Sequence, residues 1–156
     1  MALKLQIMLF LLFPLLGMAQ INSTELKTTT EYMVQSPYTF TQTIERLQEI
    51  LKSKGITVFA TIDHQAAAKA VGEKLAPATV LIVGNPKIGT ALMQENPRFA
   101  IELPLKILIY EENKTVNIRY EKIAAMGEKY HIKQNFSTAE KIDAAMQQLI
   151  KLSISK

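Results

Sequence analysis

The sequence predicts one small α+β domain, in which amphipathic helices cover a mixed or mainly antiparallel β-sheet. Apolar residues recur at helical spacing in residues 39–54 and 137–152. Between these two segments lie short apolar or alternating runs, which are typical of strands. With 156 residues, of which 48% are hydrophobic and 21% charged, the chain can build one core but not two.

The N-terminus has the pattern of a secretory signal peptide. Lys4 precedes an apolar run over residues 5–16, and Gly17-Met18-Ala19 matches the small-x-small cleavage motif. The run is shorter than the roughly 20 residues that span a bilayer. We therefore expect cleavage near Ala19-Gln20, export to the periplasm or the extracellular space, and no stable membrane insertion afterwards.

Removal of residues 1–19 would leave a polar linker over residues 20–31 and an α+β domain over residues 32–156. The chain has no cysteine. Packing alone must therefore stabilise the exported domain, and thiol catalysis and thiolate metal sites are excluded. The net charge is +4, with acidic and basic residues interspersed, which argues against binding to nucleic acid or to an anionic membrane.

The first predicted elements are a strand over residues 32–38 and a helix over residues 39–54. Thr39 and Gln42 have the spacing of a capping box at the start of this helix. Gly55 follows its last residue, where a glycine commonly ends a helix. The apolar stripe of the helix indicates that it covers a sheet.

Three further segments read as strands. Residues 56–62 alternate, with four side chains expected on one face: Ile56, Val58, Ala60 and Ile62. Residues 80–83 are wholly apolar, which predicts a buried, central strand with no polar face. Residues 105–110 and 115–120 resemble the two arms of a hairpin that turns at residues 112–114.

The remaining segments predict helices. Ser137 and Glu140 have capping-box spacing at the start of the last helix, over residues 137–152. Shorter helices are expected over residues 66–71 and 88–93.

Asp63 and His64 follow a predicted strand and open a predicted helix. Asp63 suits an N-cap, where its carboxylate accepts from exposed backbone amides. His64 would lie in the first turn, where the helix dipole disfavours the imidazolium. A neutral imidazole can act as a ligand, a base or a hydrogen-bond donor, but His64 can equally be an ordinary surface histidine. No metal site is predicted, because no second histidine or nearby glutamate stands at ligand spacing.

The loop over residues 84–90 superficially resembles a phosphate-binding loop. Thr90 stands where the phosphate-binding lysine belongs, and Pro86 has no amide hydrogen to donate, so nucleotide hydrolysis is excluded. Two interpretations remain open. Asn85, Lys87 and Thr90 either supply polar groups to a pocket wall, or Asn85 holds a tight strand-to-helix turn.

Lys106 shares one predicted sheet face with Leu108 and Tyr110. A lysine on a largely apolar face needs a partner, for which Glu102 and Asp63 are candidates, or an exit to solvent. Alternatively its ammonium binds an anionic ligand beside Asn85.

Three motifs together resemble the DUF302 domain family. They are IDHQAAA at residues 62–68, VLIVGNPKIGT at residues 80–90 and ELPLKILIY at residues 102–110. The family carries similar Asp-His, Gly-Asn-Pro-Lys and Leu-Pro-Leu-Lys series in this order. The resemblance implies a small α+β domain, a homodimer, and convergence of the three motifs at one place, but no reaction.

Two hypotheses about function follow. The first is a non-catalytic exported module that binds a small molecule or a protein partner in a pocket flanked by Asp63, His64, Asn85 and Lys106. Haem with His64 as axial ligand is a special case of it. The alternative is an enzyme with His64 as general base and Lys106 or Asn85 stabilising negative charge. Because adjacent side chains diverge on a helix, Asp63 is poorly placed to orient His64, so we predict no catalytic residue.

Overall fold

The computed structural model describes residues 29–156. The predicted signal peptide and most of the predicted linker lie outside them. The elements in chain order are β1 (Glu31–Ser36), α1 (Phe40–Ser53), β2 (Thr57–Asp63), α2 (His64–Ala70), β3 (Ala78–Gly84), α3 (Pro86–Glu95), the 3-10 helix η1 (Pro97–Ile101), β4 (Leu105–Glu112), β5 (Thr115–Glu121), α4 (Ile123–Lys129) and α5 (Phe136–Ser153). Among residues 29–156, no helix combines the length and apolarity needed to cross a membrane.

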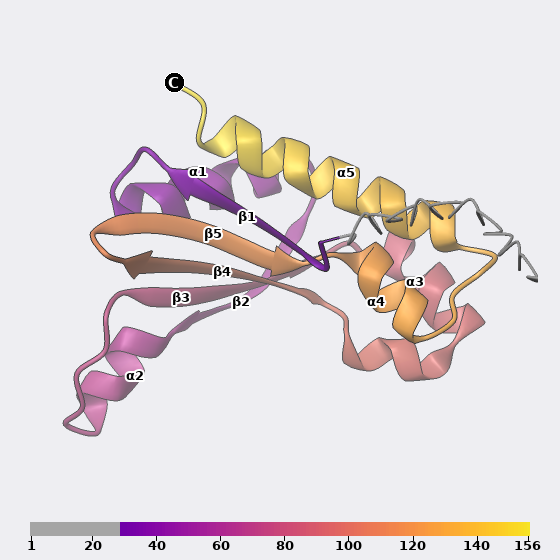
Figure 1. The fold of residues 1–156 in the computed structure, drawn as a ribbon, viewed down its shortest axis with the longest axis horizontal. Helices are drawn as coiled ribbons and strands as arrows, with labels where there is room; N and C mark the ends of the chain where they lie inside the picture. The colour runs from indigo at the N-terminus through magenta and orange to yellow at the C-terminus, as the bar shows by residue number, and fades with distance from the viewer. Residues whose placement is uncertain (1–28) are drawn as a thin grey trace, which may run out of the picture.

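The five strands form one sheet in the order β1-β5-β4-β3-β2, and every neighbouring pair is antiparallel. The predicted α+β class is therefore confirmed. Figure 1 shows α1 and α5 together on one side of the sheet, with α2 projecting beyond the ends of β2 and β3, away from α5. Side chains of β3, β4 and β5 that point toward α1 and α5 form the core: Leu81, Val83, Leu105, Ile107, Ile109, Val116, Ile118 and Tyr120.

Helix α1 begins and ends as predicted. Thr39 accepts from the amide of Gln42, and the Gln42 side chain accepts from the Thr39 amide, which completes the capping box. Gly55 has a φ of 70°, the left-handed conformation that glycine adopts without a steric cost. Leu47 and Leu51 are fully buried against the sheet.

Strand β2 departs from the predicted alternation. A β-bulge lies at Phe59, because Val58 pairs with Val83 while Ala60 pairs with Ile82. Val58 therefore faces the helices, whereas Ala60 and Ile62 lie on the other face. The expectation that these alternate residues share one face is wrong, since one extra residue reverses the alternation.

Strand β3 is paired on both sides but lies next to the edge strand, and β4 occupies the centre of the sheet. Leu81 and Val83 are buried, while Val80 and Ile82 remain partly exposed. The expectation of an interior strand with no polar side chain over residues 80–83 is confirmed. The expectation that it is wholly buried is wrong for a physical reason: α1 and α5 cover only one face of the sheet.

The predicted hairpin is confirmed, with Asn113 and Lys114 as the two turn residues between β4 and β5. Their φ values of 51° and 63° are both positive, as in a type I′ turn. Asparagine tolerates this conformation better than most residues, which explains how a hairpin forms here without glycine.

Helix α5 begins at Phe136, and no side chain caps it. The predicted capping box of Ser137 and Glu140 is therefore wrong. The preceding loop is held from α3 instead: the Glu95 carboxylate accepts from the backbone amides of three successive residues, Lys133, Gln134 and Asn135. These hydrogen bonds, that of Lys133 first, lower the pKa of Glu95 to about 2.

The C-terminal end of α5 is tied to α1. Arg46 donates from Nε to the carbonyl of Ser153 at 2.7 Å and from Nη2 to that of Ser155 at 2.9 Å. Its guanidinium also lies 4.1 Å from the centre of the Tyr38 ring. A cation at this end of α5 complements the helix dipole and satisfies carbonyls that the helix leaves free.

The low pKa of Glu95 predicts how stability changes with pH. Because the folded-state pKa lies below the ordinary 4.5, the carboxylate stabilises the fold above about pH 4.5, and this contribution is lost as the pH falls toward 2. We expect Glu95→Gln to melt below the wild type at pH 7, with a difference that shrinks between pH 4.5 and 2. Melting curves at several pH values check this, with Glu140→Gln, an exposed glutamate of α5, as control. A pH-independent difference would contradict the assignment.

Candidate ligand-binding site

A cavity of about 250 Å³ lies between the sheet and helices α3 and α5. Strands β2, β3 and β4 supply one side of its wall through Phe59, Val83, Gly84 and Leu105, together with Ile56 and Pro104, which directly precede β2 and β4. Helix α3 supplies Pro86, Ile88, Gly89 and Met93, and helix α5 supplies Ile142, Ala145, Met146 and Leu149. Leu103 and Ile123 complete the apolar lining.

Among the described residues that line this cavity, Asn85 has the one polar side chain, and none is acidic or basic. The amide oxygen of Asn85 already accepts from the backbone amide of Lys87 at 3.0 Å. Phe59 and Ile88 are 50% and 42% exposed, which places the opening of the cavity beside them. The cavity therefore offers a hydrophobic environment that is accessible from solvent.

The loop after β3 shapes one wall through local structure. Asn85 is the N-cap of α3, and Pro86 occupies the first helical turn, where its missing amide hydrogen costs no hydrogen bond. Thr90 donates to the carbonyl of Pro86 at 2.6 Å, and Lys87 is exposed to solvent. The geometry thus supports the structural interpretation of Asn85, although Asn85 also lies in the cavity wall.

The glycines of this loop allow α3 to lie close to the strands. A Cβ atom at Gly89 would stand 3.1 Å from Leu103 Cδ1, closer than most real contacts. A Cβ atom at Gly84 would stand 3.4 Å from the Phe59 ring. The Gly-Asn-Pro-Lys and Leu-Pro-Leu-Lys motifs therefore meet at the cavity through their apolar members.

The Asp-His motif does not reach this cavity. Asp63 pairs with Thr79 at one end of β3, whereas Thr57 pairs with Gly84 at the other end. The five residue steps between Thr79 and Gly84 correspond to roughly 17 Å of extended strand, at about 3.4 Å per residue. The expected convergence of all three motifs is therefore wrong within one copy of the chain.

At the end of β2 that lies away from the cavity, Asp63 is the N-cap of the following helix, as predicted. Its Oδ1 accepts from the amide of Ala66 at 2.9 Å and caps α2. His64 is exposed in the first turn of this helix, and α2 buries none of its side chains. Neither residue lies in the cavity wall.

Lys106 is exposed on the sheet face opposite the buried Leu105 and Ile107, as the alternation predicts. Glu102, one of its two candidate partners, forms an ion pair with Lys129 at 3.1 Å. The pKa of Glu102 is lowered chiefly by a hydrogen bond from Tyr130 and then by Lys129, with a weaker attraction from Lys106. Lys106 lines a second cavity, separate from the apolar one, together with the charged side chains of Glu102, Arg119 and Glu121.

Sequence reasoning did not find the α5 side of the cavity. Ile142, Met146 and Leu149 have the spacing of ordinary core residues, and only the tertiary arrangement leaves space beneath them. Ala145 offered a weak signal, because a small residue within an apolar helical stripe leaves room beside it. Within residues 29–156, no group of three histidine, aspartate or glutamate side chains could hold a metal ion.

The fold and the cavity define a class: a small α+β domain whose antiparallel sheet is covered by helices on one face and encloses a hydrophobic site there. The model of the family "Domain of unknown function DUF302" matches residues 32–152, and the chain belongs to that family. The resemblance carried by the three motifs is thereby confirmed. The crystal structure of an uncharacterized conserved DUF302 protein from Bacillus stearothermophilus superposes with a TM-score of 0.75 and 25% identity, covering 80% of this chain and 98% of that one.

Curated relatives share a shorter segment. Proteins named fluoride-specific ion channel FluC 1, from Brucella suis and Brucella abortus, are 40% identical over 79 residues. The segment is 51% of this chain but only 31% and 29% of those relatives. The chain therefore spans less than a third of the curated relatives it matches.

The two cap residues predict different costs of substitution. Asn85→Ala should lower the free energy of unfolding by about 1 kcal/mol, because the substitution removes the N-cap of α3. The loss affects the core, since α3 forms part of the cavity wall. Asp63→Ala should cost less, since α2 buries nothing and can open without exposing the core. Urea denaturation measures both. An equal or larger cost for Asp63→Ala would show that Asp63 does more than cap α2.

Proposed function

We propose that the domain binds a small apolar molecule, or the apolar part of an amphiphile, in the cavity beside Asn85, without changing it chemically. The observation that carries the proposal is the lining itself: sixteen of its seventeen residues are apolar or glycine. Water gains few hydrogen bonds from such a wall, so an apolar occupant is favoured over water.

The size of the cavity limits the ligand. An engineered apolar cavity of about 150 Å³ binds benzene, while sites for drug-sized ligands begin at about 300 Å³. At about 250 Å³, this cavity accepts a group larger than benzene and smaller than a typical drug. Each methylene group that it buries should contribute about 0.8 kcal/mol to binding.

The enzymatic alternative has less support. It needs His64, Asn85 and Lys106 at one place, but the chain puts them at one end of β3, at the other end, and on the opposite sheet face. No acid, base or nucleophile lies among the described residues of the cavity wall. A haem ligated by His64 would also need another surface, because His64 is exposed and lies outside that wall.

We do not transfer channel activity from the Brucella relatives. The matched segment is less than a third of each of those proteins. What supports the binding proposal is this chain's own cavity, together with the two family motifs that line it.

A series of 1-alkanols tests the proposal. We expect the melting temperature to rise with chain length until the alcohol fills the cavity, and then to level off, because further methylene groups find no space. Ala145→Phe should fill part of the cavity, so the rise in melting temperature should disappear or level off at a shorter alcohol. Calorimetry at a fixed alcohol concentration measures the shifts.

The matched control is Ala144→Phe. Ala144 is exposed on the same helix and lies outside the cavity wall, so this variant should respond as the wild type does. Equal responses in Ala145→Phe and the wild type, or no response in either, would overturn the proposal.

We propose further that the protein acts after export. The support is the sequence pattern of residues 1–19. The protein recovered from its native host should have the mass of a chain whose first residue is Gln20. Recovery of the uncleaved chain, with the mass of residues 1–156, from a cytosolic fraction would contradict export.

A further inference from the structure

The sheet opens where β4 begins and β5 ends. Strand β4 starts at Leu105, yet its pairing with β5 starts only at Leu108, which lies opposite Arg119. Beyond Arg119, the remaining residues of β5 pair with β1 alone. In Figure 1 the chain that enters β4 and the chain that leaves β5 for α4 draw apart at this point. Two neighbouring strands therefore separate here, which leaves space between them.

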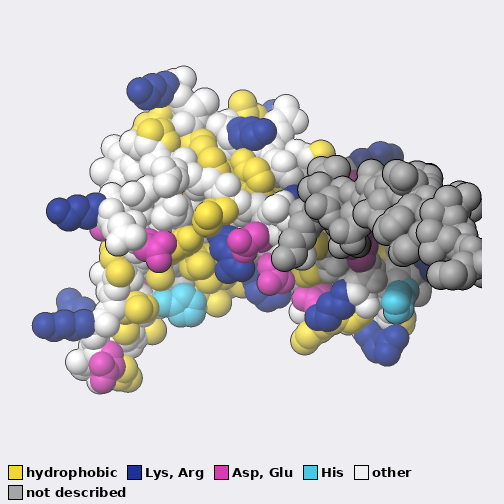
Figure 2. Space-filling view, viewed as in Figure 1, with side chains coloured by type: hydrophobic (Ala, Val, Ile, Leu, Met, Phe, Trp, Pro, Cys, Tyr) yellow, Lys and Arg dark blue, Asp and Glu magenta, His cyan; other side chains and the backbone are white. Residues whose placement is uncertain are grey.

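The second cavity lies in this opening. It has a volume of about 250 Å³, and its lining residues are Glu102, Leu105, Lys106, Arg119, Glu121 and Met126. Leu105 and Met126 are 4% and 7% exposed, so their apolar side chains form its inner wall. The other four lining residues are charged. Figure 2 shows basic and acidic side chains next to one another, among hydrophobic ones, on the surface below α1 and α5.

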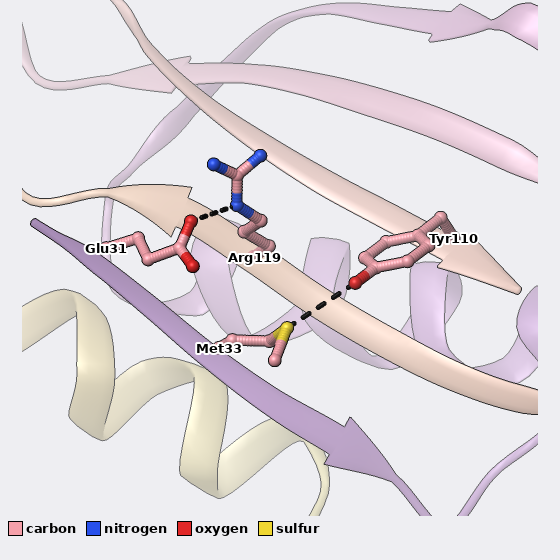
Figure 3. Close-up of polar contacts among 4 residues, drawn as sticks. All are labelled: Glu31, Met33, Tyr110 and Arg119. Atoms are coloured by element: carbon pink, nitrogen blue, oxygen red, sulfur yellow. Dashed lines mark hydrogen bonds and ion pairs between the residues drawn. The ribbon is translucent and has the colours of Figure 1, made fainter. Parts of the chain in front are cut away.

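Two of the four charges are already paired. Arg119 donates from Nε to the carboxylate of Glu31 (Figure 3), and Lys129 donates to Glu102 at 3.1 Å. Both Nη groups of Arg119 have no hydrogen-bond partner among residues 29–156. The guanidinium can therefore donate to a further molecule without giving up its ion pair.

The other two charges, Lys106 and Glu121, have opposite signs. The ion pairs among residues 29–156 are those of Arg119 and Lys129, and neither includes Lys106 or Glu121. Both side chains are exposed, one on β4 and the other at the end of β5. They line one cavity without forming an ion pair, so they present a positive end and a negative end to its occupant.

These charges select a class of ligand. A simple anion would be attracted by Lys106 but repelled by Glu121, and a simple cation would be repelled by Lys106 and Arg119. A zwitterion carries both signs. Its carboxylate can accept from Lys106 and from the Nη groups of Arg119, while its ammonium donates to Glu121. An α-amino acid has this pattern, together with a side chain that can contact Leu105 and Met126.

We propose that the second cavity binds a free α-amino acid with a small apolar side chain. Its carboxylate lies between Lys106 and Arg119, its ammonium beside Glu121, and its side chain against Met126. Leu105 is the one residue that lines both this cavity and the apolar cavity. Because the apolar cavity has no charged side chain in its wall, the two sites take different ligands.

Three probes with five carbon atoms test the proposal: norvaline, pentanoate and pentylamine. The comparison is made by isothermal titration calorimetry at pH 7 with Ala145→Phe, whose apolar cavity is partly filled, so that an alkyl chain bound there does not contribute. We expect norvaline to bind about 10-fold or more tightly than either other probe, because each of those lacks one of the two charged groups.

Substitutions with matched controls locate the site. Lys106→Gln and Glu121→Gln should each weaken norvaline binding about 10-fold or more. Lys69→Gln and Glu112→Gln also remove exposed charges, but outside the second cavity, and should leave norvaline binding unchanged. Circular dichroism verifies the fold of each variant.

The two cavities can be tested separately. Lys106→Gln should keep the response of the wild type to 1-alkanols, since Lys106 lies outside the apolar wall. Three outcomes would overturn the amino-acid site: no binding of norvaline, norvaline binding no tighter than that of pentanoate or pentylamine, or norvaline binding that survives both Lys106→Gln and Glu121→Gln. None of them bears on the apolar cavity.

Discussion

Helices α1 and α5 cover one face of the sheet, and the other features of the molecule depend on this one-sided coverage. Side chains alternate along β3 and β4, so Val83 and Leu105 enter the core while Ile82 and Lys106 point the opposite way. The ligand cavity lies on the covered side, where α3 and α5 approach the sheet without filling the space. Neither α1 nor α5 covers the opposite face of the same strands, where Ile82 and Lys106 lie.

Local chemistry accounts for what the sequence could predict. The capping box of α1, the N-cap Asp63, the strand-to-helix turn at Asn85 and the hairpin all depend on residues within a few positions of one another. The family was also accessible, because its motifs are contiguous. Lys106 was correctly placed on its sheet face, since alternation within one regular strand needs no tertiary information.

Long-range features escaped prediction for physical reasons. The bulge at Phe59 depends on how β2 pairs with β3, and the start of α5 depends on Glu95, some forty residues earlier in the chain. Reading β3 as buried on both faces required knowing how many layers of helix the chain supplies. Of the candidate site, Asn85 reaches the cavity wall, whereas Asp63, His64, Lys87, Thr90 and Lys106 do not. The apolar members of the same motifs form the wall, and nothing in their sequence distinguishes a cavity from a filled core.

The isolation of α2 gives this part of the chain its own dynamics. The helix buries no side chain and is tied by the Asp63 cap and by one hydrogen bond from Gln65 to the carbonyl of Leu75. Its opening breaks few contacts, so its amide hydrogens should exchange with solvent far sooner than those of β4. Proteases should also cut first in this segment. The Asp-His motif therefore lies in a region that can unfold locally while the remainder of the domain stays native.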